Sequence, residues 1–147
     1  MVQLFVYGTL RSPVGGPEDD TRNYLRIERQ VLSVQPAMLR NADLLSFIHY
    51  PGVWPGSGVV VGELFELTNE GLTICDQIEG HPDWYERRMD SVELADGRRT
   101  PAWVYWMPEE MVGSGELIAS GDWFDRDRSR SDGRTFAQAL AEDRAKR

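Results

Sequence analysis

The chain has 147 residues, of which 41% are hydrophobic, and a formal net charge of −8 from 16 basic and 24 acidic side chains. This length suits about one domain and is enough to close a single hydrophobic core. The acidic balance argues against nucleic-acid binding, because contact with a phosphate backbone needs a cationic surface. No apolar run approaches the roughly 20 residues that cross a bilayer, so no membrane partner is expected.

The residue types that build disulfides and metal sites are scarce. Cys75 is the single cysteine, which excludes an internal disulfide framework and a zinc site made of paired thiols. His49 and His81 are too few and too scattered to suggest a metal centre. The first ten residues lack the basic leader and small-residue cleavage site of a signal peptide. We therefore expect a soluble, cytoplasmic domain that binds no metal.

The first part of the chain is predicted to hold two extended segments around one short helix. Residues 2–7 are rich in β-branched and aromatic types and end at Gly8, which indicates a buried strand. The pattern over residues 21–29 fits a short helix. Residues 30–40 are predicted to be extended, with a break at Pro36.

Proline and glycine punctuate the middle of the chain before an apolar strand predicted over residues 59–67. A helix is predicted over residues 68–79, with Thr68 as its N-cap and with Gly80 as its end. Its apolar face carries Leu72, Cys75 and Ile78. Because Cys75 lies on that face, we interpret it as a core residue and not as a nucleophile.

The last part of the chain contains one hairpin and one helix. Strands within residues 89–97 and 98–107 are predicted to join at an Asp-Gly turn. Residues 120–133 are polar and irregular, and the final residues, from 135 onward, favour a short helix. Together these elements predict one α+β domain with a mainly antiparallel sheet that can curl into a barrel.

The turn Tyr7-Gly8-Thr9-Leu10 is the first candidate binding site. A strand that ends in glycine frees backbone N–H groups, which can bind a carboxylate or an oxyanion. Gly8 also lets the backbone approach a ligand closely, because it has no Cβ. The alternative interpretation is a simple strand end.

Glu79 is the candidate catalytic group. It is predicted to end a helix, where a carboxylate faces the negative end of the helix dipole, and its neighbours Ile78 and Trp84 are apolar. Both conditions raise the pKa of a carboxyl group, as suits a general acid or base. The alternative is a solvated glutamate before a glycine.

Other polar and aromatic residues are given structural interpretations. Ordinary surface charge is favoured for Asp76, Asp83, Glu86 and Arg88. Trp103 and Tyr105 alternate along a strand and share one face, which favours core packing with some access to a pocket. Serine-hydrolase, phosphate-loop and dinucleotide-binding motifs are missing from the sequence.

Several segments resemble, in order, the gamma-glutamylcyclotransferase-like superfamily over about residues 2–125. They are FVYGTLR at 5–11, YPG at 50–52, GELFEL at 62–67, DQIEGHPDWYERR at 76–88 and SGDW at 120–123. The short chain and the Tyr-Gly-Thr-Leu motif are most similar to the gamma-glutamylamine cyclotransferase branch and its small bacterial relatives.

The resemblance implies a small, mixed, mainly antiparallel β-barrel with a few short helices and a pocket at one mouth. It also implies an enzyme that cyclises a γ-glutamyl group to 5-oxoproline and releases the attached amine, with neither metal nor organic cofactor. The family's catalytic glutamate falls on Glu79, and its substrate-binding loop falls on the turn Tyr7 to Leu10. Tyr85 matches the tyrosine that follows the glutamate and is expected to support the pocket.

Two segments depart from the family pattern. Residues 11–20 carry prolines and acidic residues where close relatives are basic. Because this segment is expected to border the pocket, the identity of the leaving amine stays open. The family-like domain is predicted to span 1–125, and 126–147 to form a polar extension with a short helix. We expect this extension to be a solvated tail, the alternative being a dimerisation arm. The alternative to catalysis is a small-molecule binding protein that keeps the same pocket.

Overall fold

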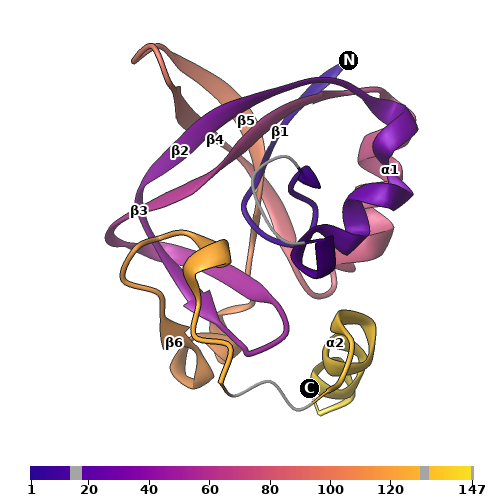
Figure 1. The fold of residues 1–147 in the computed structure, drawn as a ribbon, viewed down its shortest axis with the longest axis vertical. Helices are drawn as coiled ribbons and strands as arrows, with labels where there is room; N and C mark the ends of the chain where they lie inside the picture. Colours follow the sequence, from indigo (N-terminus) through magenta and orange to yellow (C-terminus); the bar gives the residue numbers. More distant parts are fainter. Residues whose placement is uncertain (14–17, 130–132, 147) are drawn as a thin grey trace.

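A computed structural model describes residues 1–13, 18–129 and 133–146, and its centre is a closed, mixed β-barrel (Figure 1). The strands are β1 (Val2–Val6), β2 (Val31–Ser46), β3 (Pro51–Leu67), β4 (Glu86–Leu94), β5 (Arg99–Trp106) and the short β6 (Glu116–Leu117). Their order is β3-β1-β5-β4-β2-β6, and an additional β2–β3 pairing closes the barrel. The predicted α+β barrel class is confirmed.

Strand β1 delivers its C-terminal end to the interior of this barrel. It pairs antiparallel with β3, from Val2 opposite Leu67 to Val6 opposite Glu63, and parallel with β5. Every other pairing in the sheet is antiparallel. Neighbours on both edges and a buried run over residues 4–6 fix the direction in which the chain leaves β1.

Helix α1 (Asn69–Glu79) matches the predicted helix closely. The Thr68 hydroxyl accepts a hydrogen bond from the Gly71 amide at the N-terminus, which is N-capping. At the other end Gly80 adopts φ 68° and stops the helix, a left-handed conformation that costs glycine little. Cys75 is fully buried, as its place on the apolar face predicted. Glu79 is therefore fixed as the last residue of α1.

Strands β2 and β3 are longer than predicted. Strand β2 continues through Pro36, which lies opposite Glu63, because a proline is tolerated where the ladder does not need its N–H. Strand β3 begins at Pro51, so the Pro- and Gly-punctuated segment belongs to the sheet. Gly56 and Gly58 pass so close to Asp43 that a Cβ at either position would overlap its carboxylate. The glycines there serve close packing and do not mark a loop.

The predicted helix at 21–29 is also different in the structure. This segment forms two 3-10 helices, η2 (Glu18–Arg26) and η3 (Glu28–Gln30), and Thr21 within η2 has non-helical angles. The Asp-Gly hairpin between β4 and β5 is confirmed, with Gly97 at φ 86°. Short 3-10 helices, η4 (Glu109–Ser114) and η5 (Trp123–Asp125), lie in the later connections. Residues 130–132 of the predicted irregular stretch lie outside the described residues.

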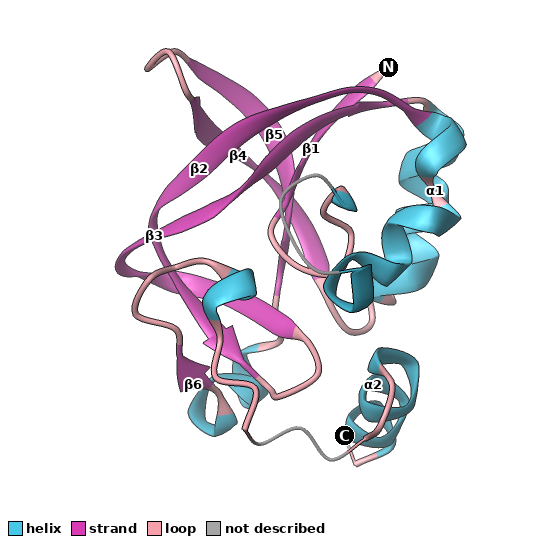
Figure 2. Cartoon of the chain, viewed as in Figure 1, coloured by secondary structure: helices cyan, strands magenta, loops and turns pink. Residues whose placement is uncertain are grey.

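Helix α2 (Phe136–Ala145) forms at the predicted place but is not a solvated tail. Thr135 and Gln138 form a reciprocal capping box at its start. Ala139 and Leu140 are buried in the same cluster as residues of α1 and the barrel. Figure 2 shows α1, η2 and α2 on the same side of the barrel. The helix is held because its small apolar face has a core to pack against.

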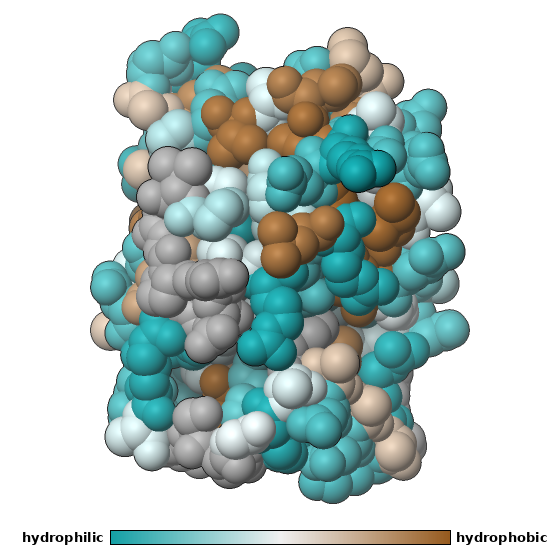
Figure 3. Space-filling model, turned by 45° about the vertical axis from the view of Figure 1, so that its right-hand side comes forward, coloured by the Kyte–Doolittle hydropathy of each residue, from teal (hydrophilic) through white to brown (hydrophobic). Residues whose placement is uncertain are grey.

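The surface carries mostly hydrophilic side chains (Figure 3), as expected from the large share of charged residues in the sequence. Figure 3 shows hydrophobic side chains in separate groups among hydrophilic ones on the face that it displays. The large exposed apolar residues of the described chain are Met1, Leu25, Leu32, Val34, Met89 and Leu117. Within the described residues, no helix is both long enough and apolar enough to span a membrane.

Candidate active site

The turn after β1 is built around a close approach between Gly8 and Pro51. A Cβ on Gly8 would lie 2.5 Å from Pro51 Cγ, so no larger side chain fits at position 8. The Arg11 amide donates to the Gly8 carbonyl at 3.0 Å and closes the turn. Glycine is required here by the neighbouring ring of Pro51, which begins β3.

Glu79 reaches the same region from the end of α1. The residue is half-buried, and its carboxyl group is closely surrounded by protein. Burial raises the pKa of Glu79 from its ordinary value of 4.5 to about 8, because desolvation disfavours the charged form. The direction agrees with the sequence-based expectation, and burial is its cause.

All six predicted site residues line one small cavity. They are Tyr7, Gly8, Thr9, Leu10, Glu79 and Tyr85. The fold thus joins the first turn of the chain to a segment some seventy residues later.

Two tyrosines fix the wall of this cavity through their hydroxyl groups. Tyr85 Oη donates to the Pro51 carbonyl at 2.5 Å, and Tyr7 Oη donates to the Tyr105 carbonyl at 2.6 Å. Burial raises the pKa of Tyr7 and of Tyr85 well above the ordinary tyrosine value. Both hydroxyl groups therefore stay protonated and serve as hydrogen-bond donors. Of these three lining residues, Glu79 is the one whose side chain can exchange a proton near neutral pH.

Asp76 is not the ordinary surface charge that its sequence context favoured. Its carboxylate accepts two hydrogen bonds from the Arg87 guanidinium, at 2.9 and 3.2 Å, and one from Tyr105 Oη at 2.7 Å. The Arg87 guanidinium also lies 4.3 Å from the ring centre of Trp103. Asp76 precedes Glu79 by three residues, so this cluster ties the end of α1 to β4 and β5.

Four further residues line the cavity and were not predicted as site residues: Phe5, Val6, Pro51 and Tyr105. Pro51 belongs to the YPG segment, which carried part of the family resemblance but was assigned no role in the site. Tyr105 was expected to pack in the core with Trp103 and to have some access to a pocket, but it was not assigned to the site. Its place in the cavity depends on the pairing of β5 with β1.

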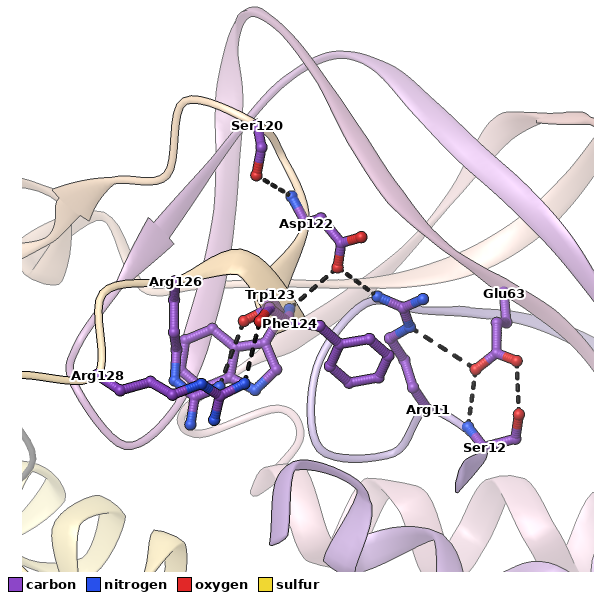
Figure 4. Close-up of polar contacts among 9 residues, drawn as sticks. All are labelled: Arg11, Ser12, Glu63, Ser120, Asp122, Trp123, Phe124, Arg126 and Arg128. Carbon is purple, nitrogen blue, oxygen red and sulfur yellow. Dashed lines mark hydrogen bonds and ion pairs between the residues drawn. The ribbon is translucent and has the colours of Figure 1, made fainter. Parts of the chain in front are cut away.

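The turn is held from the side of η2 and from β3. Asn23 Nδ2 donates to Thr9 Oγ1 at 2.7 Å. The amide and hydroxyl of Ser12 donate to the two carboxylate oxygens of Glu63, at 2.7 and 2.6 Å (Figure 4). Residues 14–17, part of the segment expected to border the pocket, lie outside the described residues.

The electrostatics of the cavity are simple. The lining residues of the described chain include no arginine, lysine or histidine. An anionic group of a ligand would be bound there by backbone N–H groups of the turn. No group of three or more potential metal ligands occurs within residues 1–13, 18–129 and 133–146. The cavity is thus lined by one carboxyl group with a raised pKa, that of Glu79, and by the backbone turn after β1.

Comparison with known proteins shows the family of this chain. The family model described as gamma-glutamyl cyclotransferase, AIG2-like, matches residues 4–125. The chain belongs to this family. The gamma-glutamylcyclotransferase family protein YtfP of Escherichia coli is 32% identical over 127 residues, covering 86% of this chain and all of YtfP. A relative from Methanocaldococcus jannaschii is 34% identical over 125 residues, covering 85% and 98%.

Solved structures of the family share the fold. The solution structure of Escherichia coli ytfP has a TM-score of 0.57 at 29% identity and covers 86% of this chain and 99% of its own. A mouse AIG2-like protein has a TM-score of 0.61 at 21% identity and covers 88% and 99%. The family match ends at residue 125, so α2 lies beyond it.

Proposed function

We propose that this protein is a gamma-glutamyl cyclotransferase that acts on a small γ-glutamyl amine or a related amide. The α-amine of the substrate attacks its own γ-carbonyl carbon, and a C–N bond closes a five-membered ring. The C–N bond to the departing amine then breaks, which gives 5-oxoproline and a free amine. The observation that carries the proposal is a single buried carboxyl group, Glu79, that shares a small cavity with the turn after β1.

Glu79 is the general base and then the general acid. The attacking α-amine is mostly protonated near neutral pH and is inert until it loses a proton. A carboxylate whose conjugate acid has a pKa of about 8 is a stronger base than an ordinary carboxylate, so Glu79 accepts that proton more readily. Glu79 then returns this proton to the departing nitrogen, and the ring nitrogen loses its remaining extra proton to solvent as the lactam forms.

The turn holds the substrate in a reactive shape. The amide groups of residues 8–10 either bind the substrate carboxylate or stabilise the oxyanion that forms on the γ-carbonyl oxygen. Bringing the amine and the carbonyl together in a small cavity supplies catalysis by proximity. Tyr7 and Tyr85 support these groups by fixing the wall.

The test is release of 5-oxoproline from a panel of γ-glutamyl amines, γ-glutamyl amino acids and glutathione, run beside Glu79→Gln. We expect turnover of one substrate class and a loss of kcat in the variant on the order of 10²- to 10⁴-fold, with substrate binding retained. Turnover by the variant at the wild-type rate would remove Glu79 from the mechanism. If no substrate turns over but 5-oxoproline raises the melting temperature, the protein is either a binding module with the same pocket or an enzyme for an amide outside the panel.

A further inference from the structure

Arg11 is an unusual residue for the inner side of a turn, because its side chain is almost completely buried. The residue is 6% exposed, and its guanidinium lies between two carboxylates from distant parts of the chain (Figure 4). Nη1 donates to Asp122 Oδ1 at 2.8 Å, and Nε lies 3.7 Å from Glu63 Oε1. The guanidinium carbon also lies 3.9 Å from the ring centre of Phe124.

The positive charge of Arg11 is fully compensated within this cluster, which carries one excess negative charge. Glu63 and Asp122 supply two negative charges against the one positive charge of Arg11, and Glu63 also accepts both hydrogen bonds of Ser12. An arginine neutralised in this way is a poor receptor for a further anion. Its planar fork is instead suited to holding its partners in a fixed geometry.

The segment that carries Asp122 is itself fixed to the barrel. Gly121 has φ 71°, and a Cβ there would lie 1.9 Å from the Val59 carbonyl oxygen, so the backbones of the two segments are in direct contact. The Val61 amide donates to the Gly121 carbonyl at 2.8 Å. The Asp122 carboxylate also accepts from the Phe124 amide at 3.0 Å. The position of the Asp122 side chain is therefore fixed by contacts other than the one with Arg11.

We propose that Arg11 is a positioning residue that, with Asp122 and Glu63, holds the turn of residues 8–10 in the geometry its amide groups need to bind substrate. This inference rests on the proposed function. It gives a role to the SGDW segment at 120–123, which contributes no residue to the cavity lining. Arg11 sits at the end of the turn, directly beside Leu10, so a shift of its side chain is transmitted to the groups that face the cavity.

The decisive variants are Arg11→Lys and Asp122→Asn. Lysine keeps the positive charge but loses the fork and the stacking on Phe124, and asparagine keeps the shape but loses the charge-assisted bond. We expect kcat/KM for 5-oxoproline release to fall on the order of 10- to 100-fold in each, because small misplacements of binding groups are costly. The pH at which activity is half-maximal should stay unchanged, because Glu79 is untouched.

The split between the kinetic constants adds a readout that a stabilising role alone would not move. A fall in kcat at constant KM assigns the turn to the oxyanion, and a rise in KM assigns it to the substrate carboxylate. The matched control is Arg40→Lys, at an exposed ion pair with Glu93 at 2.9 Å, which should leave both constants unchanged. If both cluster variants lower only the melting temperature and keep the wild-type kcat and KM, the proposal is wrong.

A second measurement separates this proposal from the proposed function. Hydrogen exchange of the Gly8, Thr9 and Leu10 amides should quicken in Arg11→Lys, while the amide of buried Val104 in β5 keeps its protection. If the wild-type protein releases no 5-oxoproline, the proposed function fails, but the exchange result still decides whether Arg11 holds the turn. Equal exchange at the turn in variant and wild type would overturn the positioning role.

Discussion

The Tyr50 hydroxyl donates a hydrogen bond to the Asp143 carboxylate and so joins the chain just before β3 to the C-terminal helix α2. Tyr50 precedes Pro51, which lines the cavity. Near this contact, the guanidinium of Arg144 lies against Gly80, the residue after Glu79. The extension beyond the family match thus contacts the protein on two segments that border the candidate site.

Docking of α2 should contribute measurably to stability. Leu140 is 4% exposed, and Leu140→Ala should cost about 2 kcal/mol or more of unfolding free energy, through lost burial and a cavity. The control Ala141→Ser, on the exposed side of the helix, should stay within about 0.5 kcal/mol of wild type. Urea unfolding checks both, and equal midpoints for Leu140→Ala and wild type would show that α2 does not pack as described.

The raised pKa of Glu79 should make stability depend on pH. Its folded value of about 8 exceeds its ordinary value of 4.5, so the folded state keeps a proton that the unfolded state releases. Between these two pH values stability falls as pH rises, and above about 8 this contribution stays constant.

Glu79→Gln removes that dependence. Relative to wild type, the variant should gain at least about 1.4 kcal/mol at pH above 8 compared with pH below 4.5, the equivalent of one pKa unit. Chemical unfolding at the two pH values measures this gain. A constant difference between the two proteins across the range would mean that burial does not perturb Glu79.

Activity should also depend on the protonation of Glu79, but it should rise with pH where stability falls. A general base works when deprotonated, so kcat/KM should rise with pH up to about 8, the pKa of Glu79 in the free enzyme. At higher pH, activity should fall again, because a substrate that binds with a free amine brings no proton that Glu79 can pass to the departing nitrogen. A pH–rate profile with a substrate that turns over checks this, and a plateau that begins near pH 4.5 would contradict the assignment.

Gly8→Ala should damage the site through the contact with Pro51. The added Cβ would lie 2.5 Å from Pro51 Cγ, so the turn must move away from the cavity wall. We expect kcat/KM to fall on the order of 100-fold. The control is Gly113→Ala, where a Cβ would meet nothing within 4 Å. If both alanine variants keep wild-type kinetics, Gly8 is not required by the close approach.

Local sequence patterns determined the elements whose signals are contained in a few neighbouring residues. The Thr68 cap and the Gly80 stop define α1, and the Asp-Gly turn defines the hairpin of β4 and β5. The apolar run that ends at Gly8 defines β1. The resemblance to the family predicted the barrel, which is confirmed, and it marked Glu79 and the turn as site residues, which stays a prediction.

The tertiary structure decided what depends on contacts between distant segments. The sequence around Gly56 and Gly58 predicts a loop, whereas the structure places both glycines in a strand beside Asp43. The sequence around Asp76 predicts a surface charge, whereas the structure places its carboxylate in contact with Arg87 and Tyr105. The same holds for Arg11, whose partners lie on β3 and in the SGDW segment. A residue's partners across a closed barrel depend on strand register, and register is set by the whole packed sheet and not by the neighbours of any one residue.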